Sequence, residues 1–453
     1  MTETYDYNNR LQVVRLQLAP YQTTNDLVCW VYNDYSNVAN PTACSISSQG
    51  TGNDGDVVGQ YEKDTVNTSL SHTVGLTYDP THRLTRSVAT GNVTHNLTFS
   101  YDRYGNMTCQ TNGQTQGPCP NYSFSASTNR ITTSGFTYDA AGDLTNDGTH
   151  SYQYDAEGRL ISVDNGTTAS YVYNALGWRV EKQVGGTYTE YLFGREGDPV
   201  GENNRGTWVD AWVSFQGVHI AHIIGGQTYF AHADRVGTTF MVTDENGNVV
   251  QDELHYPWGQ EWTRVGTMEE ERFARLNHRD SETSLDPTHF RMYSSGVGRW
   301  LTPDPVRACP LHPQNFDRYA YVGNSPTNRT DPHGDAVYPG FDYPYIDYGY
   351  YPPGYGYDEF DYLSYYYDFV PVGDIVLEGA GVLLCPECDV VVIRMVVAYQ
   401  LYLLHECEAQ YQRDLKGRRL SDPGARSRCY ESALNRKNRC EQGWNPLPPL
   451  ITW

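Results

Sequence analysis

Residues 138 to 163 read YDAAGDLTNDGTHSYQYDAEGRLISV and hold two copies of one short phrase. Each copy consists of Tyr-Asp, two variable residues, Gly, one further residue and Leu, and the copies begin at Tyr138 and Tyr154. Aromatic and polar residues alternate around them, as in Tyr152-Gln153-Tyr154, which is the pattern of a half-buried β-strand. The stretch therefore predicts a strand, a four-residue turn and a returning strand.

The chemistry of the predicted turn is local. An Asp or Asn at the first position accepts a hydrogen bond from the backbone two residues on, and a Gly at the fourth position adopts the angles that follow a type I turn. Four copies fit best. Their predicted turn residues are Asp102 with Gly105, Asp139 with Gly142, Asp155 with Gly158, and Asn174 with Gly177.

Weaker copies extend the repeat in both directions. They begin at Tyr5-Asp6, with Asn9 where Gly would stand, at Tyr78-Asp79, where Pro80 suits the turn, and at Thr243-Asp244. One hairpin cannot bury its aromatic face alone, so we expect neighbouring units to stack. Residues that favour helices are sparse before about residue 265, and no helix is expected there.

Composition restricts the function classes. The chain has 453 residues, 38 of them Tyr, and a formal net charge of −22. A nucleic-acid-binding body would show a basic face, so the acidic balance argues against one. The N-terminal residues have neither the basic nor the apolar segment of a signal peptide, although the chain starts in mid-repeat, which favours a truncated N-terminus.

The repeated phrase resembles the YD repeat of the RHS family. A later stretch is similar to that family's RHS-associated core domain, and the resemblance covers about residues 5 to 335. The motifs that carry it are Gly298-Arg299-Trp300-Leu301-Thr302-Pro303-Asp304-Pro305, Tyr319-Ala320-Tyr321-Val322-Gly323-Asn324-Ser325-Pro326 and Asp331-Pro332-His333-Gly334.

The resemblance implies a mainly β fold. We expect a spiral of YD-repeat β-hairpins that forms a partial hollow shell, an RHS-associated core plug and a small α-helical C-terminal tail. The expected divisions are a YD-repeat shell over residues 1–265, the core domain over 266–335, a Tyr/Pro/Gly-rich linker over 336–388 and a variable helical region over 389–453.

In toxin members of this family, the shell holds a variable C-terminal domain, and an aspartic-type self-cleavage after Asp-Pro-x-Gly frees it. By this resemblance, the candidate catalytic residues here are Asp304, Asp331 and Arg291, with cleavage near Asp335. The family often has a second Asp after the core Arg, but Met292 stands there in this chain. Asp331 or Asp286 could supply the missing second carboxylate. A turn-forming role for Asp304 and Asp331 is the competing interpretation, because Asp-Pro often opens a turn.

The tail differs sharply in composition. Between Tyr338 and Tyr367, 12 of 30 residues are Tyr, which is typical of an extended linker. An apolar stripe after residue 389 favours two short helices, and Cys407 could form a disulfide with Cys429 across them. Cys385-Pro-Glu-Cys388 resembles half of a zinc site, but the second pair is missing.

Three functions remain open. The first is a non-enzymatic shell used in encapsulation or cell-surface contact, with no cofactor. The second is a polymorphic toxin that releases its C-terminal effector. The third is a metal-binding tail module. The expected partners are the chain's own C-terminal region and components of the cell surface or a secretion system. We expect neither a nucleic-acid partner nor a clear membrane span, and the resemblance implies a secreted or cell-surface location.

Overall fold

The computed structural model describes the greater part of the chain up to residue 339. The described ranges are 1–8, 10–20, 25–33, 43–46, 53–109, 122–194, 199–215, 218–266, 268, 272–306 and 313–339. The chain divides into two compact units, residues 1–357 and 358–453, and the second lies wholly outside the described ranges.

The first large sheet has eight strands among the described residues, and each strand pairs antiparallel with the next in the chain. Alternate positions are buried, as in β2, where Leu16 and Leu18 are inaccessible to solvent and Arg15 and Gln17 are half-buried. Its strands are β1 (Thr2–Tyr7), β2 (Val13–Ala19), β3 (Val28–Asn33), β4 (Gly59–Asp64), β5 (His72–Tyr78), β6 (Leu84–Gly91), β7 (His95–Tyr101) and β8 (Met107–Cys109).

The second large sheet has twelve strands in the described part, again in sequence order. They are β11 (Tyr152–Tyr154), β12 (Leu160–Val163), β13 (Ala169–Tyr173), β14 (Arg179–Val184), β15 (Thr187–Phe193), β16 (Pro199–Asn204), β17 (Thr207–Phe215), β18 (Val218–Ile224), β19 (Gln227–Ala233), β20 (Thr239–Asp244), β21 (Val249–His255) and β22 (Glu261–Gly266).

Shorter elements complete the described chain. β9 (Phe136–Tyr138) pairs with β10 (Leu144–Asp147), β23 (Leu285–Pro287), β24 (Met292–Ser294) and β25 (Arg299–Trp300) form a three-stranded sheet, and β26 (Arg329–Thr330) pairs with β27 (Tyr338–Pro339). The helical segments found among the described residues are 3-10 turns, namely η1 (Thr68–Leu70), η2 (Asp164–Gly166), η3 (Pro313–Phe316) and η4 (Tyr321–Asn324). The prediction of a mainly β fold is confirmed, while the predicted helical tail lies outside the described residues.

The predicted turns connect hairpin strands. The Asp155 N–H donates to the Arg159 carbonyl over 3.0 Å, and the Gly158 N–H donates to the Asp155 carbonyl over 3.1 Å. The Asp155 carboxylate accepts the N–H groups of Glu157 and Arg159 at 2.9 and 3.0 Å. The same first-position side chain accepts backbone N–H bonds at Asp102, Asp139 and Asn174. Gly105, Gly142, Gly158 and Gly177 all have positive φ.

In the weaker copy that begins at Tyr5-Asp6, the predicted turn position was wrong by two residues. The turn begins at Asn8, whose carbonyl accepts the Leu11 N–H over 3.0 Å, and Leu11 takes the left-handed conformation with φ of 60°. Asp6 instead pairs with Arg15 on the neighbouring strand, 2.7 Å away. Tyr7-Asn8 is therefore the true counterpart of Tyr-Asp, because an Asn side chain supplies the same acceptor as Asp.

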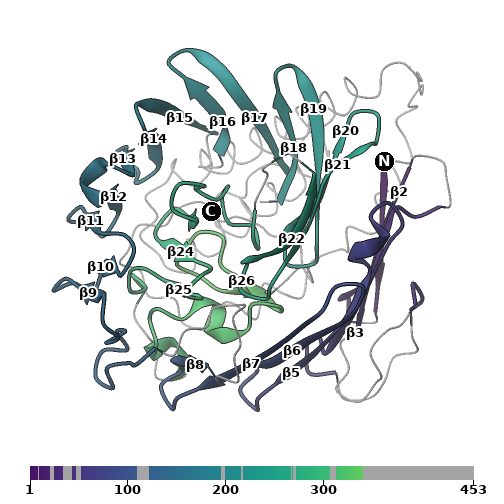
Figure 1. The fold of residues 1–453 in the computed structure, drawn as a ribbon, viewed down its shortest axis with the longest axis horizontal. Helices are drawn as coiled ribbons and strands as arrows, with labels where there is room; N and C mark the ends of the chain where they lie inside the picture. Colours follow the sequence, from purple (N-terminus) through teal and green to yellow (C-terminus); the bar gives the residue numbers. More distant parts are fainter. Residues whose placement is uncertain are drawn as a thin grey trace, which may run out of the picture. The chain divides into compact units, whose positions relative to one another are not determined.

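Side chains from both large sheets meet in one apolar cluster. Leu16, Trp30 and Leu97 of the first sheet share it with Met241 and Leu254 of the second. Trp258 of the turn between β21 and β22, Tyr293 of β24 and Tyr321 of η4 also belong to it and are nearly inaccessible to solvent. In Figure 1 the short strands β24, β25 and β26 lie between the strands of the two large sheets.

Polar contacts attach the short elements to both large sheets. The Arg299 Nη1 group donates to Asn106 beside β8 over 3.0 Å. Arg179 and Lys182 of β14 bind the buried carboxylate of Asp280 at 2.5 and 2.9 Å. Arg299 and Asp280 are therefore each held by a polar contact to one of the two large sheets.

Candidate functional site

Arg291 stands at the centre of the candidate site. It precedes β24, and its side chain is almost fully buried, with the guanidinium carbon 4.3 Å from the centre of the Trp300 ring. A planar, permanently charged guanidinium can serve several acceptors at once in such a position. Its surroundings therefore determine what the site can do.

Arg291 joins the two predicted carboxylates to one backbone carbonyl. Its Nη2 atom lies 2.9 Å from Asp304 Oδ2 and 3.1 Å from Asp331 Oδ2. Because both oxygens contact the same nitrogen, the two carboxylates lie close to each other. The Nε atom donates a hydrogen bond to the carbonyl oxygen of Gly334.

Asp331 organises the turn that contains this carbonyl. Its Oδ1 atom accepts the N–H groups of Gly334 at 2.9 Å and of Asp335 and Ala336 at 3.1 Å each. Burial raises the pKa of Asp331 to about 7, although Arg291 and the Ala336 N–H oppose the shift. Near neutral pH this carboxyl group can therefore both hold and release a proton.

Asp304 and Asp335 complete the acidic group around Arg291. Burial raises the pKa of each, while Arg291 opposes the shift of Asp304 and His333 that of Asp335. The Asp304 backbone is anchored to Arg318, since each residue donates a hydrogen bond to the other's carbonyl over 2.8 Å. Asp304 and Asp331 therefore contact Arg291 from two separate segments of the chain.

Gly334 could not be another residue without disturbance. Its φ is +82°, and an added Cβ would lie 2.3 Å from Thr288 Oγ1. The Gly334–Asp335 peptide bond thus passes close to Arg291 with its carbonyl polarised by the guanidinium. Two carboxyl groups of raised pKa beside a polarised amide are the groups that acid-base hydrolysis of that amide requires.

The structure brings Asp304, Asp331 and Arg291 together around the predicted cleavage position. The competing turn interpretation also has support, since Asp331 accepts three backbone N–H groups of its own turn. Asp286, the other carboxylate considered as a replacement, is instead bound by Arg279 at 2.8 and 2.9 Å. Met292 lies in an apolar cluster with Leu285 and Leu301.

Several features of the site and fold were not anticipated from the sequence. The contact of Arg291 with the Gly334 carbonyl was missed, although the Gly of Asp-Pro-x-Gly was a signal that the backbone passes close to something. Asp234 and Gly237 also form a turn like those of the repeat. Cys29 and Cys44 form a disulfide, whereas the predicted pair Cys407 and Cys429 lies outside the described residues.

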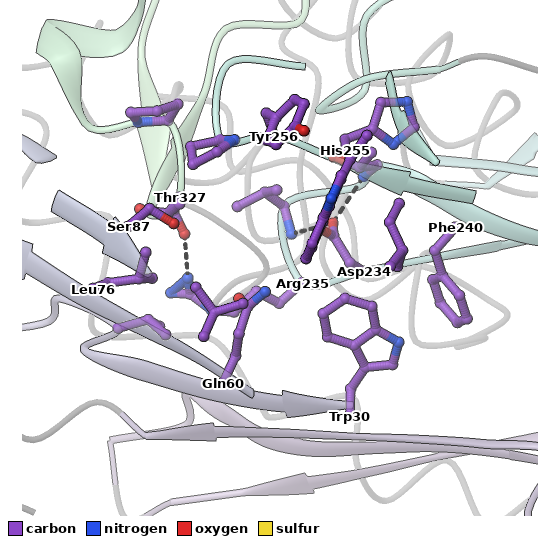
Figure 2. A pocket seen from close by; sticks show the side chains of 18 of the residues that line it. Trp30, Gln60, Leu76, Ser87, Asp234, Arg235, Phe240, His255, Tyr256 and Thr327 are labelled. Atoms are coloured by element: carbon purple, nitrogen blue, oxygen red, sulfur yellow. Dashed lines mark hydrogen bonds between the residues drawn. The ribbon is translucent and has the colours of Figure 1, made fainter. Parts of the chain in front are cut away.

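A small pocket lies between the two large sheets. Figure 2 shows Trp30 and Gln60 of the first sheet facing Asp234, Arg235 and Phe240 across it. Its volume is about 80 Å³. Sites for drug-sized ligands occupy roughly 300–1,000 Å³, so this cavity is too small for an organic cofactor.

Among the described residues, no helix combines the length and the apolar composition needed to cross a bilayer.

Comparison with known proteins identifies the repeat. The teneurin YD-shell family model matches residues 58–327. The chain is 25% identical over 258 residues to the tRNA3(Ser)-specific nuclease WapA of Bacillus spizizenii, covering 53% of this chain and 11% of WapA. It is 24% identical over 345 residues to teneurin-1 of Gallus gallus, covering 73% of this chain and 12% of that protein. The chain thus spans about a tenth of the length of these relatives.

A solved structure has the same fold. The crystal structure of TcdB2-TccC3 without its hypervariable C-terminal region aligns with a TM-score of 0.56 at 18% identity. The alignment covers 73% of this chain and 18% of the other. At this level of identity the likeness concerns the fold alone.

Proposed function

Because the chain belongs to the teneurin YD-shell family, we propose that its β-sheet body is a structural shell that holds the C-terminal region of the same chain. Two relatives support this proposal. TcdB2-TccC3 has a hypervariable C-terminal region, and WapA is a nuclease. In this proposal residues 335–453 are the enclosed segment, and the body itself carries no enzymatic activity toward other molecules.

A second candidate function is cleavage of the chain between Gly334 and Asp335. The observation that carries it is the guanidinium of Arg291, which contacts the Gly334 carbonyl, Asp331 and Asp304 together. In the proposed reaction, ionised Asp304 takes a proton from a water molecule, and the water oxygen bonds to the Gly334 carbonyl carbon. Protonated Asp331 gives its proton to the Asp335 nitrogen as the C–N bond breaks.

Arg291 stabilises the negative charge that develops on the Gly334 oxygen in this reaction. The products are a carboxylate at Gly334 and an amine at Asp335. Cleavage would break the covalent connection between the body and residues 335–453, although Asp335 and Ala336 would still donate hydrogen bonds to Asp331. The alternative roles of the tail, an effector and a metal-binding module, both fall on residues outside the described ranges.

We also propose that the protein works outside the cytosol, either secreted or on a cell surface. The disulfide between Cys29 and Cys44 supports this location, because disulfides persist in oxidising compartments and are rare in the cytosol. The partner in this proposal is a component of the cell surface or of a secretion system.

Intact-mass measurement of the purified full chain tests the cleavage. We expect two species that correspond to residues 1–334 and 335–453, and a single intact species for Asp304→Asn and Asp331→Asn. The matched control is Asp286→Asn, which alters another buried carboxylate of an Asp–Arg pair and should still be cut. An intact wild-type chain, or unimpaired cleavage in Asp331→Asn, would exclude the reaction.

Limited proteolysis tests the enclosure independently. Trypsin sites are frequent between Arg413 and Arg439. If the shell holds this region, these sites are cut slowly in the native chain and rapidly once urea unfolds the body. Rapid cutting in the native protein while the body stays intact would contradict the shell role and would leave the cleavage proposal standing.

A further inference from the structure

Three buried carboxyl groups meet at one place between the two large sheets. Glu62 and Asp64 stand two residues apart on β4, so their side chains share a face, and Asp252 reaches them from β21. Their solvent-exposed fractions are 0%, 2% and 0%. One ligand oxygen from each lies within 4.8 Å of the others.

Part of this cluster is satisfied by hydrogen bonds. Asp64 Oδ1 accepts the backbone N–H groups of Val66 and Asn67, each over 2.7 Å. Asp252 Oδ2 accepts the side-chain amide of Asn67 over 2.6 Å. Asn67 therefore ties the two sheets together and fixes the orientation of both carboxyl groups.

The remaining oxygens are buried without a hydrogen-bond donor. They are Glu62 Oε1 and Oε2, Asp64 Oδ2 and Asp252 Oδ1. His72 Nδ1 lies 3.3 Å from Glu62 Oε2, but this nitrogen donates its proton to the Leu70 carbonyl over 2.8 Å.

Such a group of oxygens is unfavourable unless a cation or protons neutralise it. A bound cation would remove both the repulsion and the unsatisfied lone pairs. Glu62 is fully buried, neither of its carboxylate oxygens accepts a hydrogen bond, and one of them lies close to Asp64 and Asp252. This unsatisfied side chain independently indicates a bound ligand.

We propose that Glu62, Asp64 and Asp252 bind a divalent cation of the calcium class, which joins the eight-stranded sheet to the twelve-stranded sheet. The donor set is made of carboxylate oxygens, which hard cations prefer and which zinc and copper sites rarely use alone. Oxygens that bind one Ca²⁺ at about 2.3–2.6 Å lie at most about 5 Å apart, and the three ligand oxygens fall within that limit.

Calcium titration of the full-length protein tests the site. The protein is stripped with EDTA, exchanged into buffer at pH 8 and titrated with CaCl₂ in a calorimeter, and thermal unfolding is followed in parallel. We expect one Ca²⁺ per chain and a rise of several degrees in Tm. MgCl₂ should give a smaller rise, because Mg²⁺ demands stricter octahedral geometry and dehydrates reluctantly.

Variants separate this site from weak binding to the acidic surface. Asp252→Asn and, independently, Glu62→Gln should weaken Ca²⁺ binding at least tenfold and remove the rise in Tm. The matched control is Glu261→Gln on β22, where the carboxylate is partly exposed and pairs with Arg264 at 3.4 Å, and it should titrate like the wild type.

Two outcomes would overturn the proposal. One is a Tm that does not respond to CaCl₂ at millimolar concentration. The other is an Asp252→Asn variant that is more stable than the wild type while calcium binding is unchanged, which would mean that a proton shared by Asp64 and Asp252 neutralises the cluster. If Asp252→Asn fails to fold, Glu62→Gln and the wild-type titration still decide between these outcomes.

Discussion

The Nε atom of Arg291 donates a hydrogen bond to the carbonyl oxygen of Gly334. The same guanidinium contacts Asp304 and Asp331 through its Nη2 atom. One side chain therefore positions both the peptide bond that leads to Asp335 and the two carboxyl groups that would act on it. Variants of Arg291 therefore test its structural role and its chemical role together.

Replacing Arg291 by Lys should abolish cleavage and destabilise the body. A Lys ammonium keeps the charge but cannot serve the carbonyl and both carboxylates in their present directions, and a buried acceptor left without its donor costs about 1–3 kcal/mol. Intact mass and urea denaturation measure the two effects. Arg279→Lys, at the buried pair with Asp286, should lose stability but still be cut. An Arg291→Lys protein that cleaves normally would contradict the assigned role.

Replacing Gly334 by Ala should cost more stability than the same change at Gly226. Both glycines have nearly the same φ, +82° and +83°, so the left-handed strain of roughly 1–2 kcal/mol is common to them. At Gly334 the new methyl group would also collide with Thr288, whereas nothing lies within 4 Å at Gly226. Urea denaturation of both variants measures the difference, and equal losses would show that the collision is relieved at no cost.

Stability should fall as the pH rises from about 4 to about 7, in part through Asp331. The pKa of this carboxyl group is raised from 3.8 to about 7 in the folded protein. In that window the folded chain holds a proton that the unfolded chain has lost, so the free energy of unfolding decreases by up to about 1.4 kcal/mol per pH unit. Asp331→Asn should flatten this slope in urea titrations at several pH values.

The control for this pH dependence has the opposite sign. Burial acts to raise the pKa of Asp155, but the hydrogen bonds from Arg159 outweigh it and lower the pKa. Asp155 therefore stabilises the protein above its ordinary pKa of 3.8, and that stabilisation is lost as the pH falls below this value. Asp155→Asn should leave the slope between pH 4 and pH 7 unchanged. A flattened slope in Asp155→Asn, or an unaltered one in Asp331→Asn, would assign the proton uptake to other groups.

Replacing Asp155 by Ala should destabilise the hairpin of β11 and β12 more than replacing it by Asn. Alanine removes the acceptor of the Glu157 and Arg159 N–H bonds, while Asn keeps an oxygen in that position. The expected loss for Ala is about 1–2 kcal/mol, and for Asn less than half of that. Hydrogen exchange of the β11 and β12 amides gives a local measurement, and equal protection in both variants would count against the turn as the stabilising element.

Reducing the disulfide between Cys29 and Cys44 should lower the free energy of unfolding by about 3 kcal/mol, because the bond closes a loop of 15 residues in the unfolded chain. Denaturation with and without dithiothreitol measures the change. Cys44→Ser should show the lower stability in both conditions. If dithiothreitol destabilises Cys44→Ser as well, the effect belongs to another cysteine.

The hairpin turns could be predicted from the sequence because their chemistry is local. Asp102, Asp139, Asp155 and Asn174 bond to backbone groups within four residues, and the glycine of each turn needs only its own backbone freedom. Such contacts depend little on what the rest of the chain does. The same reasoning failed at Asp6. Both Tyr5-Asp6 and Tyr7-Asn8 fit the start of a turn, and the pairing of β1 with β2 places the turn at Asn8.

The sequence by itself determined the repeat, the mainly β architecture and the acidic residues that belong to the candidate site. Only the tertiary structure decided which of them meet. Arg291 contacts the Gly334 carbonyl, and Glu62 lies close to Asp252, although the residues of each pair are far apart in the chain. No local pattern encodes such pairs, because their distance depends on how whole sheets pack, and packing sums many weak contacts over the entire core.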